Sequence, residues 1–464
     1  MWGRAVFFVF VLSALSIGAA GCGGRGVPDA QVPINIAFTT DVFSLDNGLR
    51  VVLHQESSAS SAVIHVRYYV GGKDDPMGRA GMAHFFEHLM FRGSRHTQGK
   101  DFTQWLAELG GDGNATTDHD TTDYFEAVPV GALRRALWLE SDRMAYPLDG
   151  LDEEGFENER RVVKNERRER YENVPFGSIG IVAHEEVFRG HPYAAPVIGY
   201  AAALDRITLD EVRAFGRRYY SPSNATLVVA SPLPLASVRK MVDEWFSSIP
   251  PAAPIPSTRV PLAFVRVATA ERPIELEADV EGPAVALAWP APPVHTDGWL
   301  ELRYAVGLVE GEIYRRLVTN RKVAYDADVD LEDGLLESMV LAMVKLKPRA
   351  SMNEAIQEID DALKEVARYG SDLFWEGFAD YRTRVALTDL RHLETLEGRA
   401  ERMLHDVDYH GATAAAQDDL RQLLRVPLVD VGGAVRQLLL DRRHVTIIVR
   451  PRPSAPPAGR RIAE

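Results

Sequence analysis

The sequence predicts an α+β protein made of two packed units, and three observations support this. The chain has 464 residues, 46% of them hydrophobic and 25% charged, which is a globular composition in a length too great for a single core. Five prolines lie between Pro250 and Pro261, and such a run is typical of a semi-rigid linker. Segments with the periodicity of strands and of helices alternate on both sides of this run.

The first unit is expected to span residues 35–249. Asn47-Gly48 is a strong hairpin signal, so strands are expected on both sides of it. Thr208 and Glu211 have the spacing of a capping box, which predicts the start of a helix. Further strands are predicted at residues 62–70 and 225–230.

The second unit is expected to span residues 262–450, after a Pro-rich linker at residues 250–261. Its composition predicts the same mixture of strands and long helices. The predicted strands are residues 273–280, 284–289, 323–331 and 444–449. The tail at residues 451–464 is rich in proline and small residues and is expected to be disordered.

The most informative motif is His-Phe-Phe-Glu-His at residues 84–88. With 3.6 residues per helical turn, His84 and His88 lie on nearly the same face and can bind one metal ion, while Glu87 projects beside them. Glu87 is then placed to activate a metal-bound water. Apolar residues flank the motif and favour a buried helix. The alternative is a pair of structural histidines that are hydrogen-bonded in a core.

A third ligand is expected from residues 156–173, a highly charged segment without Gly or Pro that predicts a long helix. Glu159 and Glu166 are seven residues apart, so two helical turns place both carboxylates on one face. One can bind the metal while the other supports the bound histidines. The alternative is a solvated helix stabilised by ion pairs between neighbouring turns.

At these residues the chain resembles the pitrilysin and mitochondrial processing peptidase family, the inverzincins with H-x-x-E-H order. In that family a charged helix follows the motif at a similar distance, and here 77 residues separate His88 from Glu166. The resemblance implies His84, His88 and Glu166 as ligands of one zinc ion, Glu87 as the base and Glu159 as a supporting acid. The stretches at residues 110–124, 191–199 and 219–229 also look like the family's.

The resemblance also implies two similar halves, each an antiparallel-rich sheet covered by helices, which close around a chamber like a clam shell. No second H-x-x-E-H motif occurs after the linker, so the duplication is only weakly visible in the sequence.

A set of two histidines and one glutamate leaves one tetrahedral position for water, which marks a catalytic rather than a structural zinc site. Zinc lowers the pKa of that water and polarises a carbonyl, and Glu87 can pass the proton to a leaving amine. The expected activity is peptide hydrolysis. Manganese or cobalt stays open, since metal choice also depends on geometry and availability.

In the family an unfolded peptide adds as a strand to a sheet edge, a mode that tolerates varied side chains. Asn114, Ala115 and Thr116 match that edge strand, although Asn114 following three glycines also fits a turn. Tyr325 matches a substrate-holding tyrosine of the family. Val318 stands where the family has an arginine, so we expect a partner subunit of the same fold to supply that arginine.

The N-terminus predicts export. Arg4 precedes an apolar run at residues 5–20, which favours a signal peptide at residues 1–21 followed by a tether at residues 22–34. Cys22, the only cysteine, follows a stretch that resembles a bacterial lipobox, so a lipid anchor to the membrane is expected. Ala19 departs from the usual leucine of that motif, which keeps a plain secreted form open.

The formal charge of −14 disfavours nucleic acid as a partner. The leading functional hypothesis is a zinc endopeptidase that acts on short or unfolded peptides in the bacterial cell envelope. The alternatives are a non-catalytic scaffold subunit of the same fold and, more distantly, a metal-binding lipoprotein. The four intact residues of the expected site favour the enzyme.

Overall fold

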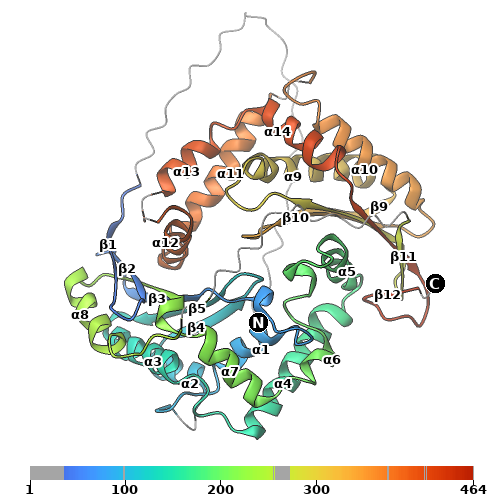
Figure 1. Ribbon diagram of the computed structural model, residues 1–464. Coiled ribbons are helices and arrows are strands. Elements are labelled where there is room, and N and C mark those ends of the chain that lie inside the picture. The colour runs from blue at the N-terminus through green and yellow to red at the C-terminus, as the bar shows by residue number, and fades with distance from the viewer. Residues whose placement is uncertain are drawn as a thin grey trace, which may run out of the picture. The chain divides into compact units, whose positions relative to one another are not determined.

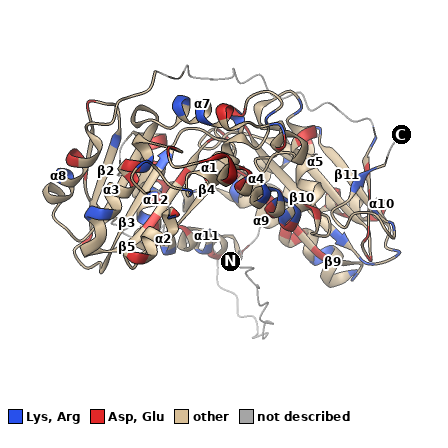
Figure 2. Cartoon of the chain, turned by 90° about the horizontal axis from the view of Figure 1, so that it is seen from below, with Lys and Arg blue, Asp and Glu red and all other residues tan. Residues whose placement is uncertain are grey.

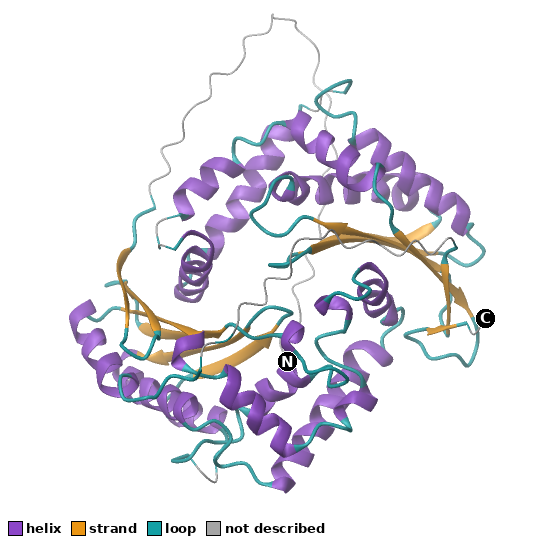
Figure 3. Cartoon of the chain, in the orientation of Figure 1, coloured by secondary structure: helices purple, strands orange, loops and turns teal. Residues whose placement is uncertain are grey.

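The computed structural model describes residues 36–97, 100–253, 255, 272–373, 376–411, 413 and 415–462. Within these residues two mixed β-sheets are each accompanied by helices, as Figures 1 and 3 show. The predicted signal peptide, tether and Cys22, and most of the Pro-rich linker, lie outside the described residues. No helix in the described part of the chain is long and apolar enough to cross a membrane.

The first sheet has the strand order β1-β2-β6-β3-β5-β4. Strands β2 and β6 are parallel, and the other neighbours are antiparallel. The strands are β1 (Thr39–Ser44), β2 (Arg50–Gln55), β3 (Ser61–Tyr68), β4 (Asp112–Thr117), β5 (Thr122–Pro129) and β6 (Ala225–Ser231). Strand β4 therefore lies at one edge of this sheet.

The second sheet has the order β12-β7-β11-β8-β10-β9, again with one parallel pair, β7 and β11. Its strands are β7 (Ile274–Ala278), β8 (Ala284–Ala291), β9 (Ala324–Glu332), β10 (Ser338–Leu346), β11 (Val445–Pro451) and β12 (Arg460–Arg461). The five neighbouring strands β7-β11-β8-β10-β9 correspond one by one to β2-β6-β3-β5-β4 of the first sheet, when the strands of each half are counted along the chain. The expected α+β fold with two similar halves is therefore confirmed.

The helices follow the same plan. In the first half they are α1 (Met82–Leu89), α2 (Phe102–Glu108), α3 (Leu133–Ala145), α4 (Glu153–Arg167), α5 (Ser178–Val187), α6 (Ala201–Leu204), α7 (Leu209–Tyr219) and α8 (Leu235–Phe246). In the second half they are α9 (Trp299–Ile313), α10 (Met352–Val366), α11 (Phe378–His392), α12 (Leu396–His410), α13 (Ala416–Leu423) and α14 (Leu428–Val435). Helix α9 connects β8 to β9, as α1 lies between β3 and β4.

Each half sends one helix onto the sheet of the other. Ile179 and Val182 of α5 pack in one cluster with buried residues of β7, β8 and β11. Met403 and Leu404 of α12 pack against buried valines of β2, β3 and β6 and a buried alanine of β6. Burying these apolar faces stabilises the contact between the halves.

The local predictions meet the structure at several points. The strands around Asn47-Gly48, the capping box that opens α7, and the strands predicted in both units are all present. The predicted helix at residues 156–173 begins earlier, at Glu153, and ends at Arg167, where a π-helical stretch, Arg168–Glu172, continues it.

The prediction of a disordered tail is wrong for residues 451–462. Ala458 is buried, and its carbonyl accepts a hydrogen bond from the Ser178 backbone amide of α5. Strand β12 pairs with β7, and Arg461 forms an ion pair with Glu186. The proline-rich composition of the segment is typical of disorder, but composition says nothing about distant partners. Here those partners supply the hydrogen bonds and the buried area that order the segment.

Candidate functional site

The N-terminus of α1 is fixed by a buried carboxylate and two glycines. Asp75 accepts hydrogen bonds from the backbone amides of Gly81 (2.6 Å) and Ala83 (2.8 Å), which would otherwise be unpaired at the helix start. Gly81 has a φ of 96°, and a Cβ there would lie 2.8 Å from the Cα of Gly199. Glycine is therefore required where these two backbones meet.

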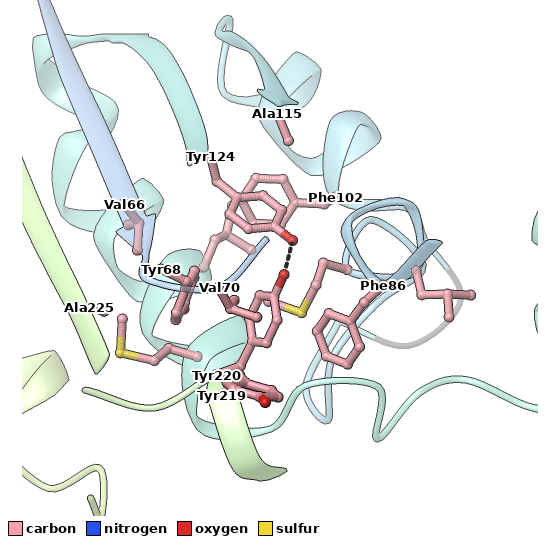
Figure 4. Close-up of a cluster of buried hydrophobic side chains, with 14 of the residues drawn as sticks. Val66, Tyr68, Val70, Phe86, Phe102, Ala115, Tyr124, Tyr219, Tyr220 and Ala225 are labelled. Atoms are coloured by element: carbon pink, nitrogen blue, oxygen red, sulfur yellow. Dashed lines mark hydrogen bonds between the residues drawn. The ribbon is translucent and has the colours of Figure 1, made fainter. Parts of the chain in front are cut away.

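Aromatic side chains hold α1 from two sides. The ring of Phe85 lies 5.3 Å from that of Phe156 on α4, and the ring of Phe86 lies 4.1 Å from that of Tyr220. Figure 4 shows Phe86 and Tyr220 in the buried cluster, where the Tyr220 hydroxyl is hydrogen-bonded to that of Tyr124 (3.3 Å). This packing leaves the histidine face of α1 directed toward α4.

Helix α4 is oriented by a buried arginine. The Arg160 guanidinium donates hydrogen bonds to the carbonyl oxygens of Leu204 and Ile207, the latter at 2.7 Å. Phe156 and Val163 are fully buried on the same side of the helix. Charged residues crowd along α4 in Figure 2, but these buried contacts decide which of them face α1.

The structure brings His84, His88 and Glu166 together, and these three residues are called the α1/α4 cluster below. One potential ligand atom from each lies within 4.8 Å of the others. Glu166 Oε2 is 3.7 Å from His84 Nε2 and 3.1 Å from His88 Nε2. The two imidazole centroids are 4.8 Å apart. The donor set and its convergence fit a zinc ion.

The buried His84 Nδ1 has no hydrogen-bond partner. Glu166 Oε2 faces the Nε2 atoms of both histidines, and an oxygen in that position can bind a cation together with them. Burial and the nearby His88 lower the pKa of His84 to about 3, so its imidazole is neutral and has a lone pair for a metal.

The second nitrogen of His88 is held by Glu159. His88 Nδ1 lies 3.0 Å from Glu159 Oε1, and Arg92 binds the other oxygen of that carboxylate. Burial acts to lower the pKa of His88, but the carboxylates of Glu159 and Glu166 outweigh it and raise the pKa to about 9. A cation at the cluster would therefore compete with a proton on His88.

Glu87 lies on α1 and is held by the edge strand. The hydroxyl of Thr117 on β4 donates a 2.6 Å hydrogen bond to Glu87 Oε2. Burial raises the pKa of Glu87 above the ordinary value of a carboxyl group, and the bond from Thr117 only partly offsets this. A raised pKa brings a carboxylate closer to the range in which it can accept and return a proton.

Asn114, Ala115 and Thr116 lie in β4, which pairs with β5 on one side and is the last strand of its sheet. Asn114 is therefore a strand residue and not the turn residue that its glycine neighbours also permitted. An unpaired strand edge offers main-chain donors and acceptors to an extended chain.

Tyr325 is not joined to the α1/α4 cluster by any contact found among the described residues. It is 53% exposed on β9, and the Lys347 ammonium lies 5.8 Å from the centre of its ring. The role predicted for Tyr325 stays a prediction.

Val318 is half-buried in a π-helical stretch, Tyr314–Asn320, and three arginines surround it in sequence. Arg315 and Arg316 form ion pairs with Glu312, and Arg321 pairs with Glu358. These guanidinium groups are already engaged by acidic residues of α9 and α10.

Sequence reasoning missed three residues that position the site: Asp75, Arg92 and Thr117. Thr117 lies in the stretch at residues 110–124 that carried part of the family resemblance, so a signal for it was present. Asp75 and Arg92 carry no motif of their own. Their roles follow only from contacts with the Gly81 amide and with Glu159.

Two family models match the chain in succession. Residues 50–200 match "Insulinase (Peptidase family M16)", and residues 206–373 match "Peptidase M16 inactive domain". The first match contains the α1/α4 cluster.

Full-length relatives are similar to the chain. The zinc protease PqqE of Helicobacter pylori is 26% identical over 442 residues, covering 88% of this chain and 92% of the relative. An uncharacterized zinc protease of Mycobacterium tuberculosis is 27% identical over 421 residues, with the same coverage of both chains. The solved structure of a protease from Helicobacter pylori matches with a TM-score of 0.79 at 23% identity, covering 89% of this chain and all of that one.

We expect Glu159→Gln to lower the affinity for zinc roughly 10- to 100-fold, because it weakens the partner that orients His88. A competition titration against a chelating dye would measure this. Glu169→Gln, on an exposed residue of the π-helical stretch after α4, is the matched control and should leave the affinity unchanged. Equal affinities for the two variants would contradict a supporting role for Glu159.

Proposed function

Because the chain belongs to the M16 family of pitrilysin-like peptidases, we propose that it is a zinc endopeptidase acting on short or unfolded peptides in the bacterial cell envelope. The convergence of His84, His88 and Glu166, with Glu87 beside them, is the observation that carries this proposal. The names of the similar proteins, zinc proteases in several bacteria, support it.

His84, His88 and Glu166 would together hold one metal ion in each chain. Zinc in such a site supplies a Lewis acid that polarises the scissile carbonyl and lowers the pKa of a water. Glu159 and Arg92 keep the His88 ring in place, because the carboxylate accepts from Nδ1 and is itself paired with the guanidinium.

Glu87 is the proposed general base. It would accept a proton from the water whose oxygen adds to the scissile carbonyl carbon, and then return that proton to the amine nitrogen as the carbon–nitrogen bond breaks. The hydroxyl of Thr117 orients the Glu87 carboxylate toward this task from β4.

The same strand is proposed to bind the substrate. A peptide that adds to the free edge of β4 would place its backbone beside Asn114, Ala115 and Thr116, one residue before the threonine that holds Glu87. Backbone recognition requires an extended chain and favours unfolded peptides over folded proteins.

The second half carries no H-x-x-E-H motif, and much of it matches the model described as an inactive domain. The catalytic residues therefore come from the first half. A purely structural role for the whole chain is not favoured, because it gives no reason for His84, His88 and Glu166 to converge with a further carboxylate, Glu87, close enough to feel their charges.

We expect Glu87→Gln to retain zinc and to lose roughly 10²- to 10⁴-fold in the rate of peptide cleavage, the usual contribution of a general base. Metal content and cleavage of an unstructured fluorogenic peptide should be measured on the same sample. Glu394→Gln, on an exposed loop residue, is the control and should keep full activity. Unchanged turnover in Glu87→Gln would remove this residue from the mechanism.

A partner subunit of the same fold is also proposed, since Val318 cannot donate a hydrogen bond to substrate. The isolated chain is then expected to cleave peptides weakly. We expect Val318→Arg to raise its cleavage rate at least about tenfold, because an arginine there would donate a hydrogen bond that stabilises the transition state. Val429→Arg, at an exposed valine of the same half, is the control. A monomeric wild-type chain with full activity would exclude the partner.

We further propose export and lipid anchoring through Cys22, on the sequence of residues 5–22 alone. Metabolic labelling with a palmitate analogue should mark the wild-type protein in the membrane fraction. Cys22→Ser should be unlabelled and soluble in the envelope or medium. Labelling of that variant, or an unlabelled wild type, would contradict the anchor.

A further inference from the structure

Two further groups of potential metal ligands lie outside the α1/α4 cluster in the described residues, and one of them has the same donor types as that cluster. It consists of His119 in the turn between β4 and β5, His184 on α5 and Glu332 at the end of β9, and is called the hairpin cluster here. Its three residues come from segments distant in the sequence, and Glu332 belongs to the second half. The structural matches and the proposed peptidase chemistry leave these residues without a role.

The hairpin cluster shares its donor types and the spacing of its ligand atoms with the first cluster, but the orientation of its rings differs. One potential ligand atom from each residue lies within 4.8 Å of the others. The two imidazole centroids are 4.9 Å apart and the ring planes are 20° from parallel, against 4.8 Å and 69° for His84 and His88. Binding one ion through both rings therefore requires one ring to turn from its position in the structure. His119 and His184 are 9% and 8% exposed, while the Glu332 side chain is about half exposed. The donor set is again two histidines and one glutamate.

Backbone carbonyls fix which nitrogen of each ring faces the cluster. His119 Nε2 lies 3.2 Å from the Ala195 carbonyl oxygen, and His184 Nδ1 lies 3.1 Å from that of Tyr193. A neutral histidine that donates to a carbonyl through one nitrogen presents a lone pair on the other. Metal-binding histidines are usually held in this way.

The third ligand is brought to the histidines by hydrogen bonds of the same turn. Asp120 Oδ2 accepts from the Leu335 backbone amide at 2.9 Å and from the Tyr193 hydroxyl at 2.5 Å. The Tyr193 hydroxyl in turn accepts from the Leu336 amide at 3.0 Å. Hydrogen bonds therefore join Asp120, the residue after His119, to the segment just after Glu332.

The charges at the hairpin cluster also favour a cation. The Glu332 carboxylate supplies a negative charge beside the two buried imidazoles. The ammonium of Lys73 is engaged by the Asp120 carbonyl at 2.6 Å and by the Asp74 carboxylate at 3.3 Å. Without a metal, a protonated His184 would pair with Glu332, at 2.8 Å, but that pair leaves His119 without a function.

We propose that His119, His184 and Glu332 bind a second divalent cation, with zinc as the best fit, that fastens the β4–β5 hairpin to α5 and to the second half. Two imidazoles and a carboxylate are ligands that zinc prefers. The hairpin carries Thr117, which holds Glu87, so the second ion would brace the strand that positions the base. Its role is structural, and it does not depend on the proposed peptidase activity.

The test counts zinc on the full chain, stripped with a chelator, reloaded with Zn²⁺ alone and dialysed. We expect two ions per chain for the wild type, one for His119→Ala/His184→Ala and one for His84→Ala/His88→Ala. His392→Ala, at an exposed histidine, is the control and should keep two. Glu332→Gln, which changes a half-exposed group and should fold normally, is expected to weaken only one of the two ions.

Unfolding temperature gives a readout independent of activity. Zinc should raise it for His84→Ala/His88→Ala, which keeps the hairpin cluster, because binding to the folded state stabilises it. One ion in the wild type that is lost with His84 and His88 would overturn the second site. Two ions in the His119→Ala/His184→Ala variant would also overturn it. One ion that is lost with His119 and His184 would instead support the second site and refute the first.

Discussion

The rest of the site depends on the contact between α1 and α4. Phe85 and Phe156 pack between the two helices, and the buried Glu159 carboxylate is shared by His88 and Arg92. A buried carboxylate is stable only when it is fully paired, so Glu159 admits few arrangements of its partners. Because Glu166 lies two turns further along α4, fixing Glu159 also directs Glu166 to the two histidines.

The two halves are coupled more closely than by the linker alone. Helix α5 packs on the second sheet, and α12 packs on the first. Arg67 of β3 adds an ion pair with Asp408 of α12, at 2.7 Å and largely buried. The β4–β5 turn is tied through Asp120 to the chain after β9. Contacts with both halves therefore help to position β4, the edge strand that carries Thr117 beside Glu87.

The repeated sheet order shows a duplication that the residues hardly reveal. Helix α9 stands in the second half where α1 stands in the first, but it carries no pair of histidines. Strand order is maintained by backbone hydrogen bonds and by an apolar core, which many different sequences satisfy. Metal binding requires particular side chains, so the site can be present in one half alone.

The sequence by itself determined the metal motif on α1, most strand positions and the cap of α7, because these depend on local periodicity and on neighbours within a few residues. Only the tertiary structure decided that Thr117 holds Glu87, that residues 451–462 are ordered, and that His119 and His184 meet Glu332. Such contacts join residues tens to hundreds of positions apart. They arise from the packing of the two sheets and their exchanged helices, which leaves no periodic trace in the chain.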